Sequence, residues 1–225
     1  MKKDIKKFSA ISAIVIIILG TLLHFTYDWS NQNAVVGLFS AVNESTWEHL
    51  KLLYFPILIT AIVGYIYYGK NTPNYWCAKV VQVLISMVFT VIIFYTYRGV
   101  LGKDIAFVNI LIFILAAVLG EIANYLVIKR GKPCNKNVAI VVLVVLFVMF
   151  INYTTNPPKM GLFQDPVSGG YGVDVWEKVC FEKSKRIFWV LWKCKKSVPQ
   201  WVRPQVGHGL DGGRTQTGTS LNVTF

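Results

Sequence analysis

The sequence predicts an all-α fold: a polytopic transmembrane bundle of five helices, with its amino terminus in the cytoplasm. Two observations carry this prediction. Of the 225 residues, 54% are hydrophobic and only 15% are charged, whereas soluble proteins carry about 25% charged residues. The charged residues also leave five long stretches almost free of charge, and each approaches the roughly 20 apolar residues that a membrane-crossing helix needs.

The five spans are rich in Ile, Val, Leu and Phe, and none has the polar face of a soluble amphipathic helix. We expect them at residues 8–27, 50–69, 78–97, 105–128 and 138–155. One such stretch alone would also fit a buried helix of a soluble protein, but five in succession favour a membrane protein. We interpret the first as a retained span because its apolar run exceeds the about 7–15 residues of a cleaved signal sequence.

Basic residues gather on one side of the predicted spans. Ten of the 23 Lys and Arg residues lie there: Lys2, Lys3, Lys6, Lys7, Lys70, Lys79, Lys129, Arg130, Lys132 and Lys136. Cytoplasmic loops are enriched in Lys and Arg, so this side is predicted to be cytoplasmic in a multi-pass protein of the cell membrane. Cys77 and Cys134 fall on the same side and are expected to be reduced thiols.

Polar residues concentrate at the predicted outer ends of the first two spans. His24 and Asp28, four residues apart, share one face at the end of the first span. The segment leading into the second span contributes Asn43, Glu44, Glu48, His49 and Lys51. Within it, Ser45 and Glu48 have the spacing of a capping box, in which each side chain bonds the other residue's backbone N–H at a helix start.

Three interpretations of this outer cluster stay open. In the first, it binds a small substrate or ion, with Glu121 as an inner relay. In the second, the protein is a membrane-embedded hydrolase in which a divalent metal activates water and Glu44 is the catalytic base. The metal ligands would then be His24, Asp28, Glu48 and His49. In the third, the protein is a structural or accessory subunit, and the same residues only cap and anchor helices.

Three strings of residues in this sequence resemble a known family. They are His24-x-x-Tyr27-Asp28-Trp29, the run from Phe39 to Lys51, and Asn156-Pro157-Pro158 followed by Phe163-Gln164-Asp165-Pro166. Together they are similar to an uncharacterised family of small bacterial multi-pass membrane proteins, a domain of unknown function. The resemblance covers about residues 1–173 and implies a membrane location, here the inner membrane. It implies no activity, substrate or cofactor.

Two polar features lie inside the predicted spans. Gln82, Ser86 and Thr90 recur every four residues and are expected to hydrogen-bond to a neighbouring helix. Glu121 lies about two turns before Lys129, near the predicted cytoplasmic interface, where an ionised carboxylate costs less than at the bilayer centre. It is expected to pair with a basic residue or to belong to a proton or cation path.

The segment 174–225 differs in character from the rest. It holds nine Lys or Arg against four Asp or Glu and is interpreted as a basic and then disordered tail, a variable or non-native extension. The basic residues on the predicted cytoplasmic side and those of this tail together explain the net charge of +12. No nucleic-acid partner is therefore expected. The expected partners are the lipid bilayer and either further copies of the chain or other membrane subunits.

Overall fold

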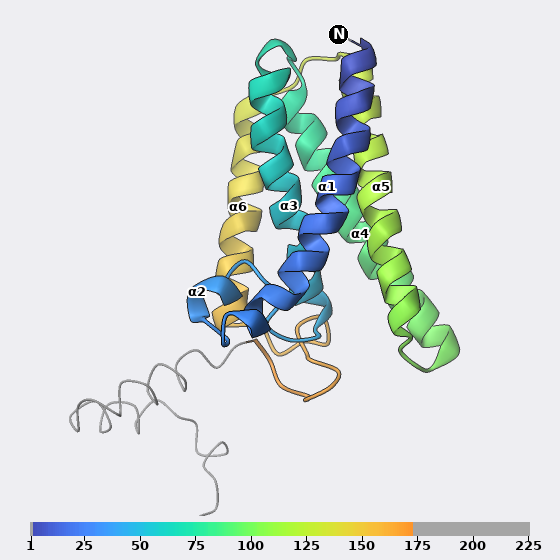
Figure 1. Ribbon diagram of the computed structural model, residues 1–225, viewed down its shortest axis with the longest axis vertical. Helices are drawn as coiled ribbons and strands as arrows, with labels where there is room; N and C mark the ends of the chain where they lie inside the picture. Colours follow the sequence, from blue (N-terminus) through green and yellow to red (C-terminus); the bar gives the residue numbers. More distant parts are fainter. Residues whose placement is uncertain (1, 173–225) are drawn as a thin grey trace, which may run out of the picture. The chain divides into compact units, whose positions relative to one another are not determined.

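A computed structural model describes residues 2–172, and this part of the chain is helical. Its elements are α1 (Lys2–Trp29), α2 (Ala34–Gly37), α3 (Thr46–Tyr67), the 3-10 helix η1 (Gly69–Asn71), α4 (Tyr75–Leu101), α5 (Ala106–Arg130) and α6 (Lys136–Thr155). The five long helices are long and apolar enough to cross a membrane (Figure 1). They confirm the predicted fold class. The expectations for residues 174–225 lie outside the described residues.

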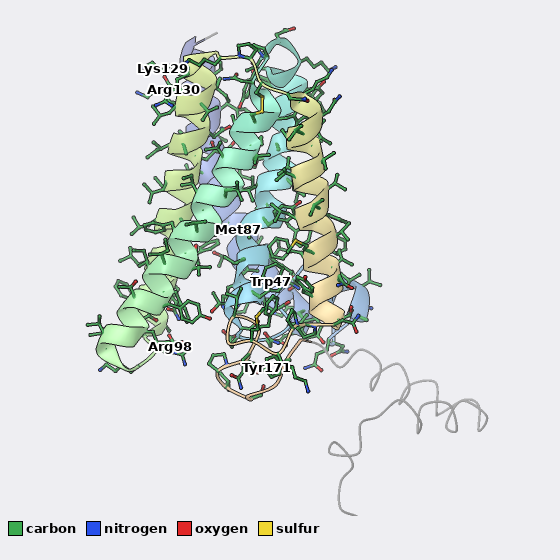
Figure 2. The ribbon with its side chains drawn as sticks, turned by 180° about the vertical axis from the view of Figure 1, so that it is seen from behind. Trp47, Met87, Arg98, Lys129, Arg130 and Tyr171 are labelled. Atoms are coloured by element: carbon green, nitrogen blue, oxygen red, sulfur yellow. A yellow bond between two sulfur atoms is a disulfide. The ribbon has the colours of Figure 1, made fainter. Side chains whose placement is uncertain are left out.

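The long helices run between two ends (Figure 1). The end that holds the start of α1, η1 and the α5–α6 connection is termed the amino-terminal end. The other holds α2, the α4–α5 turn and the segment 156–172 that follows α6, and is termed the α2 end. Figure 2 shows Lys129 and Arg130 at the amino-terminal end and Arg98 and Tyr171 at the α2 end. The cytoplasmic location of the amino-terminal end stays a prediction.

Helix α3 is the most enclosed of the five. Within its apolar window 61% of the residues are buried, against 22–28% in the other four helices. Apolar side chains cover its whole circumference, which is typical of a helix surrounded by others. Tyr54, for example, packs against Phe150 of α6 with ring centroids 4.9 Å apart and donates a hydrogen bond to Leu143 O at 2.6 Å. The start of α3 is therefore fixed by neighbours on several sides.

Helices α4 and α5 pack closely because a glycine lies at their contact. A Cβ atom at Gly120 would come within 2.0 Å of Ser86 Oγ. Ser86 Oγ donates to Ala116 O at 2.9 Å, and Gln82 Nε2 donates to Glu121 at 2.8 Å. The predicted interhelical role of Gln82 and Ser86 is confirmed, as expected for small and polar residues at helix contacts in membranes. The same expectation is wrong for Thr90, which donates to Ser86 O within α4 at 2.9 Å.

The outward faces of the long helices remain apolar. On α1, for example, Ile11, Ile14 and Ile18 are 53–60% exposed. A soluble monomer rarely exposes such extended apolar surfaces. These faces indicate a lipid environment for the bundle.

The expectation of two reduced cysteines at the amino-terminal end is wrong. Cys77, near the start of α4, forms a disulfide with Cys134 in the α5–α6 connection, and their Cα atoms are 6.5 Å apart. The two residues are 57 positions apart, so no local spacing motif revealed the pair. Disulfides are typical of oxidising compartments, whereas the Lys and Arg bias predicts a cytoplasmic location for the same end.

Candidate functional site

The connection between α1 and α3 is held against the end of α1 by a buried serine. Ser40 Oγ accepts hydrogen bonds from Thr26 Oγ1 at 3.0 Å and from Tyr27 N at 3.2 Å, and it also contacts Leu23 O. The chain then turns into α3 beside the last turns of α1. This placement brings residues 43–49 close to His24.

Only one of the two hydrogen bonds of the predicted capping box forms at the start of α3. Ser45 Oγ accepts from Glu48 N at 3.4 Å, which is the first half of a capping box. The second half is replaced, because Ser45 N donates to Asn43 Oδ1 at 2.9 Å. Asn43 also donates from Nδ2 to Gly172 O at 3.2 Å. Asn43 thereby links the start of α3 to the segment 156–172, and the Glu48 side chain is free to turn elsewhere.

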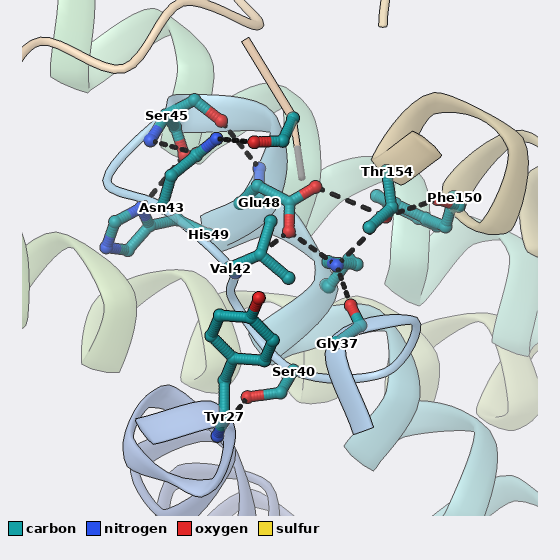
Figure 3. Close-up of polar contacts among 12 residues, drawn as sticks. Tyr27, Gly37, Ser40, Val42, Asn43, Ser45, Glu48, His49, Phe150 and Thr154 are labelled. Atoms are coloured by element: carbon teal, nitrogen blue, oxygen red, sulfur yellow. Dashed lines mark hydrogen bonds and ion pairs between the residues drawn. The ribbon is translucent and has the colours of Figure 1, made fainter. Parts of the chain in front are cut away.

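Glu48 and Lys51 form a buried ion pair within α3 (Figure 3). Lys51 Nζ lies 2.5 Å from Glu48 Oε2 and donates to Gly37 O at 2.8 Å and to Thr154 Oγ1 at 3.0 Å. The second oxygen, Glu48 Oε1, lies 3.3 Å from Thr154 Oγ1, and Val42 N donates to Glu48 Oε2 at 3.1 Å. Both charged side chains are at most 2% exposed, so this network joins α2, α3 and α6 in the interior.

A second group of polar side chains faces the other way, toward α1. His24, Glu44 and His49 each offer one ligand atom, and these atoms lie within 4.8 Å of one another. His49 Nε2 is 3.4 Å from Glu44 Oε2, and His24 Nε2 is 4.0 Å from Glu44 Oε1. The three side chains are 32–51% exposed. This cluster, the only such group among the described residues, is therefore accessible to water at the α2 end.

The His49 ring is oriented by the backbone. Its Nδ1 lies 2.9 Å from Ser45 O, and because a carbonyl oxygen only accepts, Nδ1 must carry the proton. Nε2 is then the nitrogen that faces Glu44. A metal-binding histidine is commonly held in this way, with its other ring N–H on a carbonyl. With Nδ1 on Ser45 O, His49 donates from Nε2 to Glu44 only when both ring nitrogens are protonated, and this hydrogen bond holds the pKa of Glu44 below its usual range. The Glu44 carboxylate is therefore ionised at neutral pH, and a bound metal ion would take the place of the Nε2 proton.

The separations within the cluster are close to those of a metal centre. Zn²⁺ binds nitrogen and oxygen ligands at about 2.0–2.2 Å in a tetrahedron, which places neighbouring ligand atoms about 3.3 Å apart. The distance of 3.4 Å from His49 Nε2 to Glu44 Oε2 meets this value, whereas His24 Nε2 lies 4.0 Å from the other oxygen, Oε1. The three ligand atoms lie within 4.8 Å of one another, so the side chains must draw together to hold an ion. His24 Nδ1 is buried and has no hydrogen-bond partner. Neutral imidazole and ionised carboxylate are the donors that such an ion takes.

The structure separates the residues that the sequence grouped together. Asp28, a predicted ligand, is exposed and lies outside the group of converging ligand atoms. Glu48, also a predicted ligand, and Lys51 belong to the buried network. Glu121 lies in α5 and pairs with Lys79 at 3.8 Å, apart from the cluster of His24, Glu44 and His49.

Thr154 is the residue of this region that the sequence analysis missed. It lies 103 positions after Lys51, and a single threonine near the end of an apolar span gives no pattern that points to a partner so distant. Its buried hydroxyl also donates to Phe150 O at 2.8 Å, the local bond that a threonine in a helix ordinarily makes. Only the packing of α6 against α3 reveals its second role.

Residues 1–173 match a protein family described as a family of unknown function (DUF6512). No curated protein and no solved structure matches the chain. The match includes all five long helices and the whole α1–α3 connection. This integral membrane protein therefore belongs to the DUF6512 family.

Proposed function

We propose that this protein binds a divalent transition-metal ion through His24, Glu44 and His49, on the outer face of the cell membrane. The observation that carries the proposal is the convergence of three ligand atoms within 4.8 Å, from α1, the α1–α3 connection and α3. Two imidazoles and one carboxylate suit Zn²⁺ and its neighbours in the first transition row, whereas Ca²⁺ and Mg²⁺ prefer sites made of oxygen ligands.

The cluster also supports a small-substrate role for the same site. Three protein ligands leave one position of a tetrahedral ion for water or for an anionic group of a bound molecule. The exposed fraction of Glu44, 51%, allows such a molecule to enter from water. The outer-face location follows the Lys and Arg bias of the opposite end.

The contacts favour binding over the hydrolase alternative. Glu44, the predicted catalytic base, lies beside both imidazoles, which is the position of a ligand. Glu48 is committed to Lys51 in the interior. The hydrolase and the accessory-subunit alternatives stay predictions. The same holds for the inner-membrane location and for a partner that is a further copy of the chain or another subunit.

Zn²⁺ titration of the purified full chain tests the proposal, with isothermal calorimetry as the readout. Glu44→Gln keeps the size of the side chain and removes its charge. It should weaken Zn²⁺ binding by more than the about 10–100-fold that loss of a supporting residue costs. The double variant His24→Ala with His49→Ala should abolish binding.

Asp28→Asn is the matched control because it removes an exposed carboxylate one turn from His24 without touching the cluster. The Asp28 charge acts on His24 only at a distance, so the Zn²⁺ affinity of this variant should fall far less than that of Glu44→Gln. If Asp28→Asn and Glu44→Gln weaken binding equally, the ion responds only to surface charge. That result, or a wild-type chain that binds no Zn²⁺, refutes the metal site and leaves these residues as caps and anchors.

A further inference from the structure

The segment 156–172 packs against the first turn of α3. Its Phe163 is 4% exposed and contacts the ring of Trp47, with the two ring centroids 4.8 Å apart. The backbone N–H of Trp47 donates to Leu162 O at 3.0 Å. Since Trp47 follows Glu44 by three residues, these contacts fix the chain just after a proposed metal ligand.

Asn43 fixes the chain just before the same ligand (Figure 3). Its Oδ1 accepts from Ser45 N at 2.9 Å, and its Nδ2 donates to Gly172 O at 3.2 Å. The first bond closes an Asx turn, in which an asparagine side chain binds the backbone two residues on, and Glu44 is the central residue of that turn. The second bond ties the turn to the segment 156–172.

Gly172 can hold its place only because it lacks a side chain. Its φ is +57°, in the left-handed region that favours glycine. A Cβ atom there would come within 2.6 Å of Thr154 O and within 2.9 Å of the Pro157 ring. The position of the carbonyl that Asn43 binds is therefore set by contacts at the end of α6.

The Glu44 side chain gains from this support of its backbone. It is 51% exposed, and its carboxylate must approach both His24 and His49 to hold an ion. A long, half-exposed side chain loses rotamer freedom when it is fixed, and an unsupported backbone would add to that cost. Residues that orient a metal ligand without touching the ion typically contribute about 10–100-fold to the affinity.

We propose that Asn43 is a positioning residue of the metal site and couples ion binding to the docking of the segment 156–172 on α3. The inference rests on the proposed function. A bound ion fixes Glu44, Glu44 lies inside the Asx turn, and the side chain that closes this turn holds Gly172 O. Such coupling is reciprocal, so the factor by which the docked segment strengthens ion binding is the factor by which the bound ion favours docking.

Zn²⁺ titration of the purified full chain by isothermal calorimetry tests the positioning role. Asn43→Ala removes both side-chain hydrogen bonds and should weaken Zn²⁺ binding by about 10–100-fold. Asn33→Ala is the matched control, because Asn33 Oδ1 accepts from Val35 N at the same distance, 2.9 Å, in the same α1–α3 connection. Asn33 caps α2 and not the turn around Glu44, so its loss should leave the Zn²⁺ affinity unchanged.

Trypsin digestion of the full chain in lipid nanodiscs tests the coupling, with mass spectrometry of the fragments as the readout. Lys159 is exposed and is the only Lys or Arg of the segment 156–172. The rate of cleavage there follows the population of the opened segment, so Zn²⁺ should slow it several-fold. Cleavage after Lys103, exposed in the turn between α4 and α5, is the internal control and should not change. In Glu44→Gln, Zn²⁺ should protect neither site.

The outcomes separate this inference from the proposed function. A wild-type chain that binds no Zn²⁺ removes both. If the wild type binds Zn²⁺ but Asn43→Ala binds it equally well, or if Asn33→Ala weakens binding as much as Asn43→Ala, the metal site stands and the positioning role is refuted. If Zn²⁺ slows cleavage after Lys159 no more than after Lys103, the coupling is refuted. The digestion uses the wild-type chain, so it decides the matter even if Asn43→Ala does not fold.

Discussion

Replacing Lys51 by methionine should be among the most damaging single changes in this protein. The ammonium group of Lys51 meets Glu48 at 2.5 Å, Gly37 O at 2.8 Å and Thr154 Oγ1 at 3.0 Å, and the side chain has no exposed surface. Methionine fills a similar volume but leaves the Glu48 carboxylate buried without its counter-charge. Removing one partner of a buried ion pair costs about 3–5 kcal/mol, so we expect a loss of stability of that size.

The measurement is equilibrium unfolding of the purified protein in mixed micelles, followed by circular dichroism. Combining Lys51→Met with Glu48→Gln should recover part of the loss, because the second change removes the unpaired charge and keeps an acceptor for Val42 N. Lys103→Met is the matched control, since Lys103 is exposed in the turn between α4 and α5. If Lys51→Met and Lys103→Met destabilise the protein equally, the Glu48–Lys51 pair is solvated and the reasoning fails.

Three further predictions concern the remainder of the bundle. Gly120→Ala should lower the unfolding temperature because its Cβ would meet Ser86 Oγ at 2.0 Å. Gly99→Ala is the control and should leave the unfolding temperature unchanged, because its Cβ would have no atom within 4 Å. Equal effects of the two changes would contradict the close helix contact. Differential alkylation with mass spectrometry should find Cys77 and Cys134 linked. Replacing both with serine should lower the free energy of unfolding by up to about 4 kcal/mol for a loop of this length. Free thiols in membranes isolated without reductant would contradict the link. Burial acts to raise the pKa of Asp165, but hydrogen bonds from Ser168 and from backbone N–H groups outweigh it and lower the pKa. The ionised form of Asp165 therefore stabilises the loop at pH values above the unfolded pKa of about 3.9, and this contribution is lost as the pH falls through the lower folded pKa. Limited proteolysis at decreasing pH should show the 156–172 loop opening. In Asp165→Asn this pH dependence should disappear.

The five spans were predictable because a bilayer penalises charge at every position along a crossing helix, whatever the tertiary contacts. The start of α3 was less so. The apolar pattern placed the span at 50–69, whereas the capping-box spacing of Ser45 and Glu48 marked the observed start of the helix, which runs from Thr46 to Tyr67. Thr46 to Lys51 carry too many polar side chains for the apolar pattern to include them in the span, and they are helical because Ser45 caps them and the interior holds the Glu48–Lys51 pair.

The residue types of the outer cluster were visible in the sequence, but their division into two groups was not. Glu48 and His49 are neighbours in the chain, and about 100° of helix rotation separates them. Glu48 therefore faces Thr154, while His49 faces Glu44 and His24. Which face meets which neighbour depends on where α1 and α6 pack, and no local pattern encodes that.

The position of Thr154 has a consequence for how the protein is made. The ribosome delivers α3 as the second long helix, with Glu48 and Lys51 already in place, but Thr154 arrives only with α6, the fifth long helix of the described residues. Until α6 inserts, the Glu48–Lys51 pair lacks its contact with Thr154 and must be shielded by lipid head groups, water or the insertion machinery. Assembly of the bundle is therefore complete only when the fifth helix leaves the ribosome, and chains cut short before α6 should be substrates for membrane quality control.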